Sequence, residues 1–303
     1  MHTWTYEQAF SRNRGLIGAD EQEKLRACCV AIPGMGGVGG VHLITLARLG
    51  IGAFRLADPD TFDVVNFNRQ LGAEISAIGR SKSAVMAEKA LEINPELKLH
   101  TSESGIDPTN VDAFLEGADV LVDGIDFFAF DARRLLFQKA RERGIWAVTA
   151  GPIGFSTAWL TFDPAGMTFD DYFDLREGME PLDQFVAFLV GLTPRATHRG
   201  YFDLSQVDAS QGRGPSVSLA CQLASGVVGA EVLKILLNRG PLRPAPHYFQ
   251  FDAYRGILRH GRLPAGNRGF LQRFKRGLLR RHMRQLGLFP APSPPVPNDH
   301  RPL

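Results

Sequence analysis

The sequence predicts an α/β protein with a Rossmann-like, doubly wound, mostly parallel sheet that carries helices on both faces. Two observations lead to this prediction. Short apolar runs bounded by turn residues alternate with longer segments of helical periodicity, which is typical of strands joined by crossover helices. A glycine-rich turn also follows the first apolar run and opens a helical pattern, as in dinucleotide-binding folds.

The expected elements follow in order along the chain. Apolar runs with turn residues at their ends predict strands at 28–32, 54–58, 98–101, 120–123, 146–149 and 154–164. Helical periodicity predicts helices at 39–49, 81–93, 108–115, 131–143 and 216–237. Small residues in the middle of the last helix favour close packing against a neighbouring element, so this helix is expected to return the chain to the core.

Changes of pattern predict four regions. Residues 1–164 form a nucleotide-binding core with an N-terminal arm, and 165–215 form an irregular, partly helical excursion that we expect to meet a substrate or partner. Residues 216–265 return to the core through a helix and strands. Residues 266–303 form a basic helix followed by a Pro-rich tail that need not fold.

Composition narrows the class of protein. The chain has 303 residues, 44% of them hydrophobic, which is enough for a large core, and its formal charge of +2 gives no argument for nucleic-acid binding. Neither a signal peptide nor a membrane-spanning run is evident, so a cytoplasmic protein is expected. Its three cysteines, Cys28, Cys29 and Cys221, form no CxxC pair, so we expect neither a disulfide framework nor a structural zinc site.

The glycine turn predicts a phosphate site. Gly34, Gly36 and Gly39 fit the G-x-G-x-x-G pattern between a strand and a helix, where backbone amides can approach a phosphate group. Asp58 ends the next expected strand and is placed to accept hydrogen bonds from ribose hydroxyls. These features alone serve a nicotinamide dehydrogenase and an ATP-using enzyme equally well.

Downstream polar residues favour ATP. Asn66, Arg69 and Lys82 follow Asp58 in order, and cations at these positions would stabilise the charge that develops during transfer at the α-phosphate. Asp126 follows a later strand at the sheet edge where ligands gather, and could bind Mg²⁺. Asp123 is a rival metal ligand, although its position nearer the strand favours a structural role.

These motifs resemble those of the ThiF/MoeB/HesA superfamily of adenylating enzymes, which are related to ubiquitin-activating enzymes. The resemblance covers most of residues 6–164 and resumes in the helix at 216–237. The stretches "GMGGVG", "DPDTFDVVNFNRQ", "GRSK" and "DGID" are similar to the family's nucleotide loop, ribose aspartate with its Asn and Arg, lysine and magnesium aspartate. "FSRNRG" resembles the leading segment, with Arg14 as the matching arginine and Arg12 as the alternative; Gly15 stands where the family usually has Gln.

The resemblance implies a reaction and a set of roles. A carboxylate, typically the C-terminus of a ubiquitin-like carrier protein or a peptide, would attack the α-phosphate of ATP and give an acyl adenylate and pyrophosphate. Asp58 would hold the ribose, Gly37 and its neighbours the phosphates, and Asp126 the Mg²⁺. Arg14 would reach the site of a partner subunit, which implies a homodimer. The residues expected to contact the nucleotide are Gly34, Gly36, Gly37, Gly39, Asp58, Asp60, Asn66, Arg69, Lys82 and Asp126.

The chain also departs from the family. The two CxxC pairs that bind zinc in many members are absent, and no cysteine lies in 165–220, where many members carry a thioester-forming residue. Cys221 follows directly and falls inside the returning helix. We expect it to serve core packing, with a nucleophilic role as the less favoured alternative. Cys28 and Cys29 begin the first strand and are expected to be buried.

The basic segment 268–287 combines seven Arg and Lys residues with Phe270, Leu271, Phe274 and Leu278 at helical spacing. We expect this apolar stripe to pack on the protein's own domain. The alternatives are contact with an anionic membrane, with RNA or with an acidic protein.

Two further functions are compatible with the sequence. A NAD(P)-dependent oxidoreductase is supported only by the general form of the glycine turn. A non-catalytic nucleotide-binding scaffold subunit is the other alternative, although such a subunit has no need for a full set of phosphate-binding side chains. The excursion at 165–215 carries no motif that names the activated carboxylate.

Overall fold

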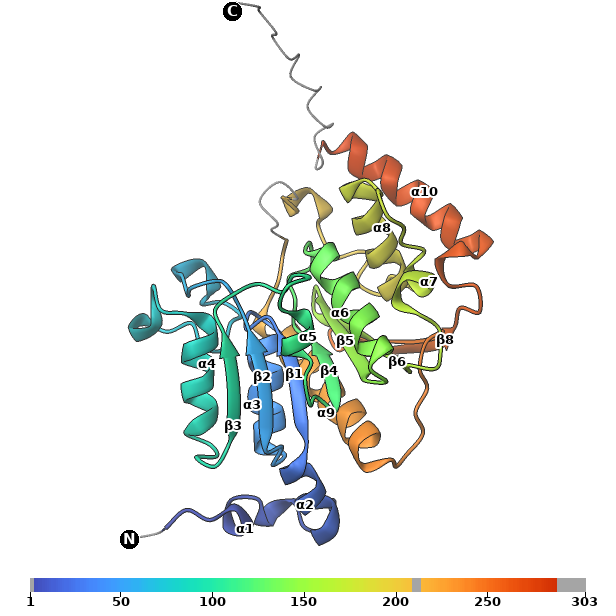
Figure 1. Cartoon of the computed structure of the whole chain (residues 1–303). Helices are drawn as coiled ribbons and strands as arrows, with labels where there is room; N and C mark the ends of the chain where they lie inside the picture. Colours follow the sequence, from blue (N-terminus) through green and yellow to red (C-terminus); the bar gives the residue numbers. More distant parts are fainter. Residues whose placement is uncertain (1–2, 209–213, 288–303) are drawn as a thin grey trace, which may run out of the picture.

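A computed structural model describes residues 3–208 and 214–287 and shows one eight-stranded sheet in this part of the chain (Figure 1). The strands lie in the order β3-β2-β1-β4-β5-β6-β7-β8. Their bounds are β1 Cys29–Pro33, β2 Ala53–Ala57, β3 Lys98–Ser102, β4 Val120–Asp123, β5 Trp146–Ile153, β6 Ser156–Phe162, β7 His247–Asp252 and β8 Ile257–Arg262. The strands predicted from sequence are confirmed, with shifts of a few residues at their ends.

The winding of the sheet determines where a ligand can bind. The five strands β3, β2, β1, β4 and β5 are parallel, and β6, β7 and β8 extend the sheet by antiparallel pairing. From β1 the chain first moves outward through β2 to β3, and then returns to place β4 on the other side of β1. The carboxyl ends of β1 and β4 therefore meet where the strand order reverses, which is the usual ligand position in such sheets.

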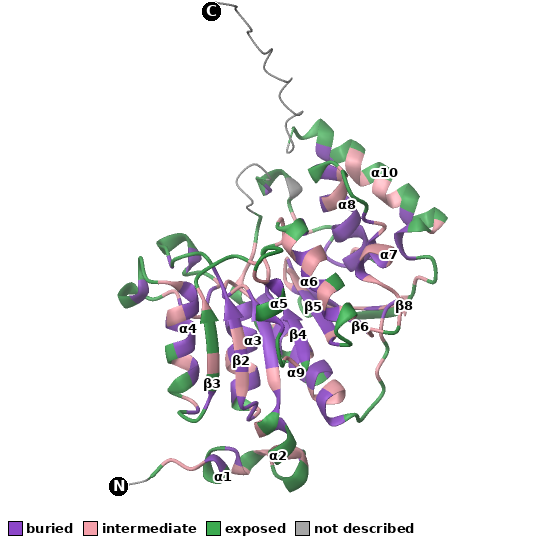
Figure 2. Cartoon of the chain, in the orientation of Figure 1, coloured by how far each residue is buried: buried purple, intermediate pink, exposed green. Residues whose placement is uncertain are grey.

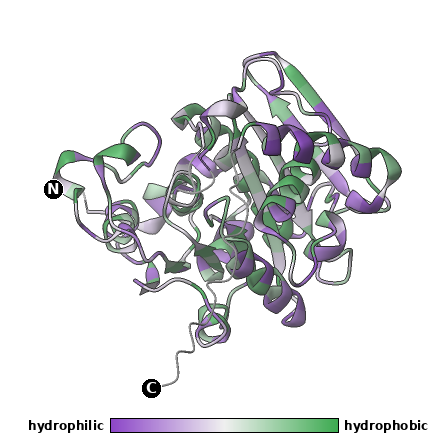
Figure 3. Cartoon of the chain, turned by 90° about the horizontal axis from the view of Figure 1, so that it is seen from above, coloured by the Kyte–Doolittle hydropathy of each residue, from purple (hydrophilic) through white to green (hydrophobic). Residues whose placement is uncertain are grey.

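Helices cover both faces of the sheet, as predicted (Figures 1 and 3). One core joins strand residues such as Val30 and Ile32 to one set of helices, and the other joins alternate residues such as Ala31 to a second set. The first set is α3 Gly39–Arg48, α4 Lys82–Leu91 and α9 Ser218–Leu237. The second is α5 Val111–Phe114, α6 Phe130–Glu142, α7 Phe169–Phe173 and α8 Pro181–Leu192.

Burial follows this layering. The strands in the middle of the sheet are largely buried, whereas the outer helical faces are exposed (Figure 2). Among the described helices, α9 alone is long and apolar enough to cross a membrane by length and composition. It packs against β5, β6 and α3, and Ala224, Val228 and Val232 are fully buried in the core. The prediction that this helix returns to the core is confirmed.

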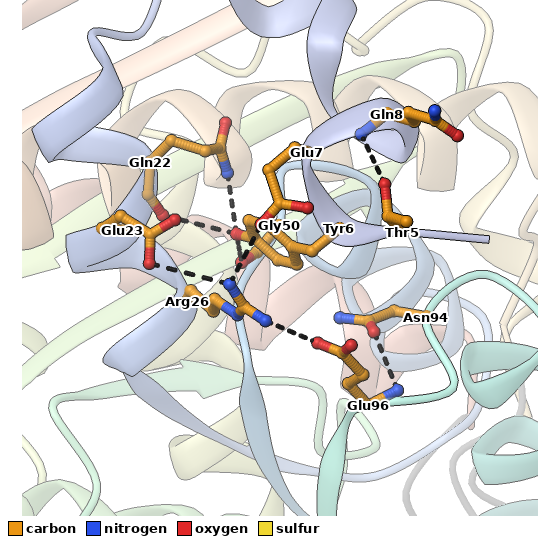
Figure 4. Close-up of polar contacts among 10 residues, drawn as sticks. All are labelled: Thr5, Tyr6, Glu7, Gln8, Gln22, Glu23, Arg26, Gly50, Asn94 and Glu96. Carbon is orange, nitrogen blue, oxygen red and sulfur yellow. Dashed lines mark hydrogen bonds and ion pairs between the residues drawn. The ribbon is translucent and has the colours of Figure 1, made fainter. Parts of the chain in front are cut away.

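The N-terminal arm contains α1 Tyr6–Ala9 and α2 Ala19–Ala27 and lies at the amino ends of the strands (Figure 1). Figure 4 shows how it is fastened to the core. The Tyr6 hydroxyl donates a hydrogen bond to the Gly50 carbonyl at 2.5 Å, and Arg26 pairs with Glu96 at 2.8 Å. This arm is thus held at the end of the sheet opposite to the carboxyl ends of β1 and β4.

The last described helix, α10 Phe270–Gln285, corrects one expectation. We expected its apolar stripe to pack on the protein, but Phe270 is 86% exposed and Leu271, Phe274 and Leu278 are each more than half exposed. The opposite face, with Gln272 and Met283, is the buried one. The reason is that Met283 and Leu279 pack into the core from this opposite face, and the ion pairs Arg276–Asp174 and Arg280–Asp183 hold the helix in the same orientation.

Candidate active site

A cavity of about 420 Å³ opens at the carboxyl ends of β1, β2, β4 and β5. We call it the sheet-edge cavity. It brings together residues that are far apart in the sequence, from the glycine turn, the ends of three further strands, α8 and the start of α9. Of the residues predicted to contact a nucleotide, those in its lining are Gly34, Gly36, Gly37, Asp58, Asp60, Arg69, Lys82 and Asp126.

The glycine turn needs glycine for two different reasons. Gly34 has φ +85°, and a Cβ there would lie 2.2 Å from the Gly124 carbonyl oxygen, so a side chain is excluded by conformation and by space. A Cβ on Gly39 would lie 1.7 Å from the Gly34 carbonyl oxygen. Gly39 is absent from the cavity lining because its role is this close packing of the turn against the first residue of α3.

The same turn presents backbone donors to the cavity. Within the described residues, the N–H groups of Gly36, Gly37 and Val38 have no hydrogen-bond acceptor. They stand immediately before α3, whose N-terminal end carries partial positive charge. Free amides at a helix N-terminus form a binding site for an anion such as phosphate.

Asp58 lies directly after β2 and is almost fully buried. Its carboxylate oxygens accept hydrogen bonds from the backbone N–H groups of Met35 and Asp60. Burial raises the pKa of Asp58, while these two hydrogen bonds and Lys82 act in the opposite direction. A carboxylate oxygen accepts more than one hydrogen bond, so Asp58 can brace the glycine turn and still accept from a ribose hydroxyl.

The two predicted cations, Arg69 and Lys82, both line the cavity. Lys82 is the first residue of α4, and its ammonium group donates to Asp60 at 2.9 Å. The Arg69 guanidinium donates to the Val65 carbonyl and to Asn68 Oδ1 at 3.1 and 3.0 Å, which leaves most of its donors free. The Lys82 side chain is buried, and its partner Asp60 is exposed.

Asn66 and Arg14 lie outside the lining. The Asn66 side-chain oxygen accepts a hydrogen bond from the Asp63 N–H at 3.0 Å and closes a local turn, so its contact with a nucleotide stays a prediction. Asn13, beside Arg14, is bonded to the Leu49 carbonyl at the C-terminal end of α3, whereas the cavity lies at the other end of this ten-residue helix. At 1.5 Å per residue the separation is about 15 Å, so neither Arg14 nor Arg12 reaches the cavity of its own chain.

Asp126 and Asp123 have different roles. Asp123 is 3% exposed and forms an ion pair at 2.9 Å with Arg133, which is equally buried, and it also accepts from the Thr149 hydroxyl. This structural role is the one that its position near the strand favoured. Asp126 is exposed, and only one of its oxygens is used, by the Phe128 N–H at 2.9 Å. One free carboxylate oxygen beside a phosphate site fits the way in which Mg²⁺ is held.

Cys221 lines the cavity from the first turn of α9. It is fully buried, and a Cβ added to Gly37 would lie 3.2 Å from its sulfur. Burial raises the pKa of the Cys221 thiol, although Ser216 and Arg69 act in the opposite direction. The thiol form is unreactive, and the packing role that we expected agrees with this geometry.

Several lining residues had no motif that pointed to them. Arg133 donates to the Ile125 and Asp126 carbonyls as well as to Asp123, and so fixes the loop after β4. Gln70 is buried and its side-chain oxygen has no partner among the described residues; it ends the stretch "DPDTFDVVNFNRQ", but no role was predicted for it. The excursion adds an aromatic wall and His198, which pattern analysis could not place.

Among the described residues, no group of three or more His, Cys, Asp or Glu lies close enough together to hold a metal ion. The expectation that the chain has no structural zinc stays a prediction. A single aspartate completed by phosphate oxygens, as at Asp126, is a different kind of site and remains compatible with Mg²⁺.

The chain is similar to known proteins of one family. A model of the ThiF family matches residues 10–268. The tRNA threonylcarbamoyladenosine dehydratase of Haemophilus influenzae is 35% identical over 153 residues, which are 50% of this chain and 58% of that protein. The probable adenylyltransferase/sulfurtransferase MoeZ of Mycobacterium tuberculosis is 32% identical over 227 residues, 74% of this chain and 51% of that protein. The chain thus spans about half the length of these relatives.

Solved structures show the same fold. The structure of Escherichia coli MccB with MccA-N7isoASN superposes with a TM-score of 0.67 at 17% identity, over 89% of this chain and 75% of that chain. Escherichia coli TcdA, a tRNA N6-threonylcarbamoyladenosine dehydratase, gives 0.57 at 24% identity, over 77% and 95%. At these identities the similarity concerns the fold alone.

The buried ion pair generates a prediction about stability. Arg133→Met leaves Asp123 as an unpaired buried carboxylate, so the free energy of unfolding should fall by about 3–5 kcal/mol. Arg134→Met on the same helix breaks the more exposed pair with Asp170 and should cost no more than about 1 kcal/mol. Urea unfolding followed by circular dichroism measures both. Equal losses in the two variants would contradict a bracing role for Arg133.

Proposed function

Because this chain belongs to the ThiF family, we propose that it is an ATP-dependent adenylyltransferase that activates a carboxylate as an acyl adenylate. The observation that carries the proposal is the sheet-edge cavity, which joins free helix N-terminal amides to Arg69, Lys82 and Asp126. A nucleotide turn with these additional charges is suited to a triphosphate and to the pyrophosphate that leaves it.

The proposed reaction is a substitution at the α-phosphorus. A carboxylate oxygen of the substrate forms a bond to this phosphorus, and the bond between it and the oxygen that leads to the β-phosphate breaks, with release of pyrophosphate. The amides before α3 hold phosphate oxygens, and Asp58 orients the ribose. Arg69 and Lys82 stabilise the charge on the departing pyrophosphate. Mg²⁺ held by Asp126 would supply further neutralisation of phosphate charge.

The two alternatives are supported less well. A NAD(P)-dependent oxidoreductase needs the glycine turn to bind the two phosphates of a dinucleotide. The additional positive charges of Arg69 and Lys82 would contribute little to binding that cofactor. A non-catalytic scaffold subunit could bind ATP without reacting. Incubation with ATP, Mg²⁺ and candidate carboxylates should give pyrophosphate exchange if the protein adenylates, and persistent failure together with tight ATP binding would favour the scaffold.

Nucleotide preference distinguishes the enzyme classes. We expect the protein to bind ATP with Mg²⁺ more tightly than NADH. Arg69→Ala should weaken ATP binding by about tenfold to a hundredfold, because hydrogen bonds to charged groups contribute about 1.5–3 kcal/mol. Isothermal titration calorimetry measures both affinities.

Arg80→Ala is the matched control, since Arg80 pairs with Glu88 and lies outside the cavity lining. This variant should bind ATP like the unmodified protein. NADH binding that is tighter than ATP binding, and is insensitive to Arg69→Ala, would support the oxidoreductase instead.

We also propose a homodimer in which Arg14 contacts the nucleotide of the partner subunit. The support is geometric, because the arm holds Arg14 at the end of α3 away from its own cavity. As in family members, the substrate would be the C-terminus of a small carrier protein or a peptide, and the compartment would be the cytoplasm.

Mixed dimers test this arrangement. Arg14→Ala and Lys82→Ala should each bind ATP weakly. After the two variants are unfolded and refolded together, about a quarter of the sites should regain tight binding, because half of the dimers are mixed and each holds one intact site. The stoichiometry of an ATP titration measures this fraction. A mixture that regains none would exclude Arg14 from the partner's site.

For residues 268–287 we propose contact with an anionic membrane surface. In α10, Arg273, Arg281 and Arg284 are exposed and have no carboxylate partner among the described residues. They flank the exposed stripe of Phe and Leu side chains defined above. A lipid interface offers an apolar layer to all four Phe and Leu side chains of the stripe and anionic headgroups to the unpaired cations, whereas RNA offers base stacking to the two phenylalanines only.

Vesicle binding tests the membrane proposal. Replacing Arg273, Arg281 and Arg284 by Gln should weaken binding to vesicles that contain phosphatidylglycerol by on the order of a hundredfold, at about 1 kcal/mol per cation. The control variant replaces Arg243, Arg259 and Arg262, which lie outside α10, by Gln. Binding to tRNA that exceeds vesicle binding, and is unchanged by Leu271→Ser and Leu278→Ser, would assign the face to RNA.

A further inference from the structure

The sheet-edge cavity has an apolar part that nucleotide binding does not explain. Its polar part is formed by the glycine turn, Asp58, Arg69 and Lys82, as described above. Beyond Asp126 the lining becomes aromatic and aliphatic. The side chains in question are Phe127, Phe128, Phe185, Phe188, Leu189 and Phe202.

These rings form a fixed wall. Phe128 stacks on Phe185 with ring centroids 5.5 Å apart, and Phe127 meets Phe188 edge to face at 4.9 Å. The Arg133 guanidinium lies 4.8 Å from the centroid of the Phe188 ring. The loop after β4 and helix α8 therefore hold each other in place, so the wall is present before a ligand binds.

The wall begins next to the reacting groups. Phe127 and Phe128 directly follow Asp126, the proposed Mg²⁺ ligand. The ring centroids of Phe127 and Phe185 are 5.4 Å apart. A carboxylate that attacks the α-phosphorus must come close to this aspartate. The group attached to that carboxylate would then lie against the aromatic side chains.

One buried polar atom in this part has no partner. His198 is 8% exposed and lines the cavity, and its Nδ1 has no hydrogen-bond partner among the described residues. Burial lowers the pKa of His198 to about 4, although Asp252 acts in the opposite direction. The ring is therefore neutral near neutral pH and offers one donor and one acceptor. An unpaired buried nitrogen is costly unless a ligand pairs with it.

We propose that the apolar part is an acyl subsite for a peptide whose C-terminal residue carries a large apolar side chain, with His198 bonded to the last peptide group. This inference rests on the proposed adenylation and names the substrate class for the same site. A C-terminal glycine would not cover the half-buried rings of Phe127, Phe128 and Phe202, whereas a phenylalanine-sized side chain would bury its own surface against them. The resulting gain in affinity is about tenfold to a hundredfold.

Stable analogues of the acyl adenylate provide the test. The three probes are 5′-O-sulfamoyladenosine alone and its N-acetylglycyl and N-acetylphenylalanyl derivatives. Their affinities for the full chain are measured by calorimetry. The phenylalanyl probe should bind about tenfold to a hundredfold more tightly than the glycyl probe. Equal affinity of these two would overturn the subsite. Failure of all three to bind would instead overturn the proposed adenylation site.

Two variants test whether the aromatic wall causes the difference in affinity between the phenylalanyl and glycyl probes. Phe128→Ala should narrow the difference between the phenylalanyl and glycyl probes to less than about threefold, since the stacked wall is opened. Phe249→Ala is the matched control, because Phe249 is also a partly buried, stacked ring but lies outside the cavity lining. An unchanged difference in Phe128→Ala, or an equal loss in both variants, would contradict the proposal.

A test of His198 must measure a quantity that would stay unchanged if this residue only stabilised the fold. A 3-phenylpropanoyl probe has the aromatic side chain but lacks the amide group. The unmodified protein should prefer the N-acetylphenylalanyl probe, and His198→Leu should abolish this preference while both probes still bind. If His198→Leu weakens both probes equally, His198 does not contact the peptide group.

Discussion

The candidate site depends on the buried ion pair between Asp123 and Arg133. Asp123 ends the central strand β4, and Arg133 stands on α6, which follows it. Through this pair and its bonds to the Ile125 and Asp126 carbonyls, Arg133 sets the path of the loop that carries Asp126. Removal of two charges from water is expensive. The pair is retained because the guanidinium satisfies both the carboxylate and the loop carbonyls, a task for which an apolar residue has no donors.

The loop that Arg133 holds also closes against the glycine turn. A Cβ on Gly124 would lie 2.7 Å from the Gly34 carbonyl oxygen and 2.9 Å from Gly39 Cα. Three glycines from two loops thus meet backbone to backbone at the switch point of the sheet. This contact brings the free amides before α3 next to Asp126, so phosphate donors and the proposed metal ligand share one cavity. A change in the backbone path of either loop would displace both the free amides and Asp126.

Local patterns explain what the sequence could predict. The helices at 39–49 and 131–143 and the strand at 120–123 have regular periodicity and clear turn residues, so they were located within a few residues. The glycine turn and Asp58 were found because their spacing reflects one strand and one helix. Arg133 was not predicted because its partner Asp123 is ten residues earlier in the sequence, separated from it by a loop and the first turn of α6. Its identity as a buried arginine is fixed by tertiary packing rather than by pattern.

The basic helix was predicted from its pattern, but the face that packs on the protein was predicted wrongly. Its apolar stripe was expected to be buried because such stripes usually face a core, but the opposite face of α10 contacts the body through Leu279, Met283 and paired arginines. The pattern defines two faces without saying which one is covered. That choice depends on partners such as Asp174, which lies about a hundred residues earlier, in the excursion. Sequence spacing carries no information about such distant partners.

The joining of a charged part and an apolar part in one cavity has a chemical consequence. The aromatic wall adjoins the exposed Asp126, whereas in the charged part of the cavity Lys82 and Cys221 are buried, and charges act more strongly where burial limits access of water. The same burial keeps the Cys221 thiol protonated by raising its pKa. Burial therefore disfavours Cys221, the only cysteine among the described residues of the cavity lining, as a nucleophile. An acyl adenylate formed here would pass to an acceptor from outside the chain rather than to Cys221.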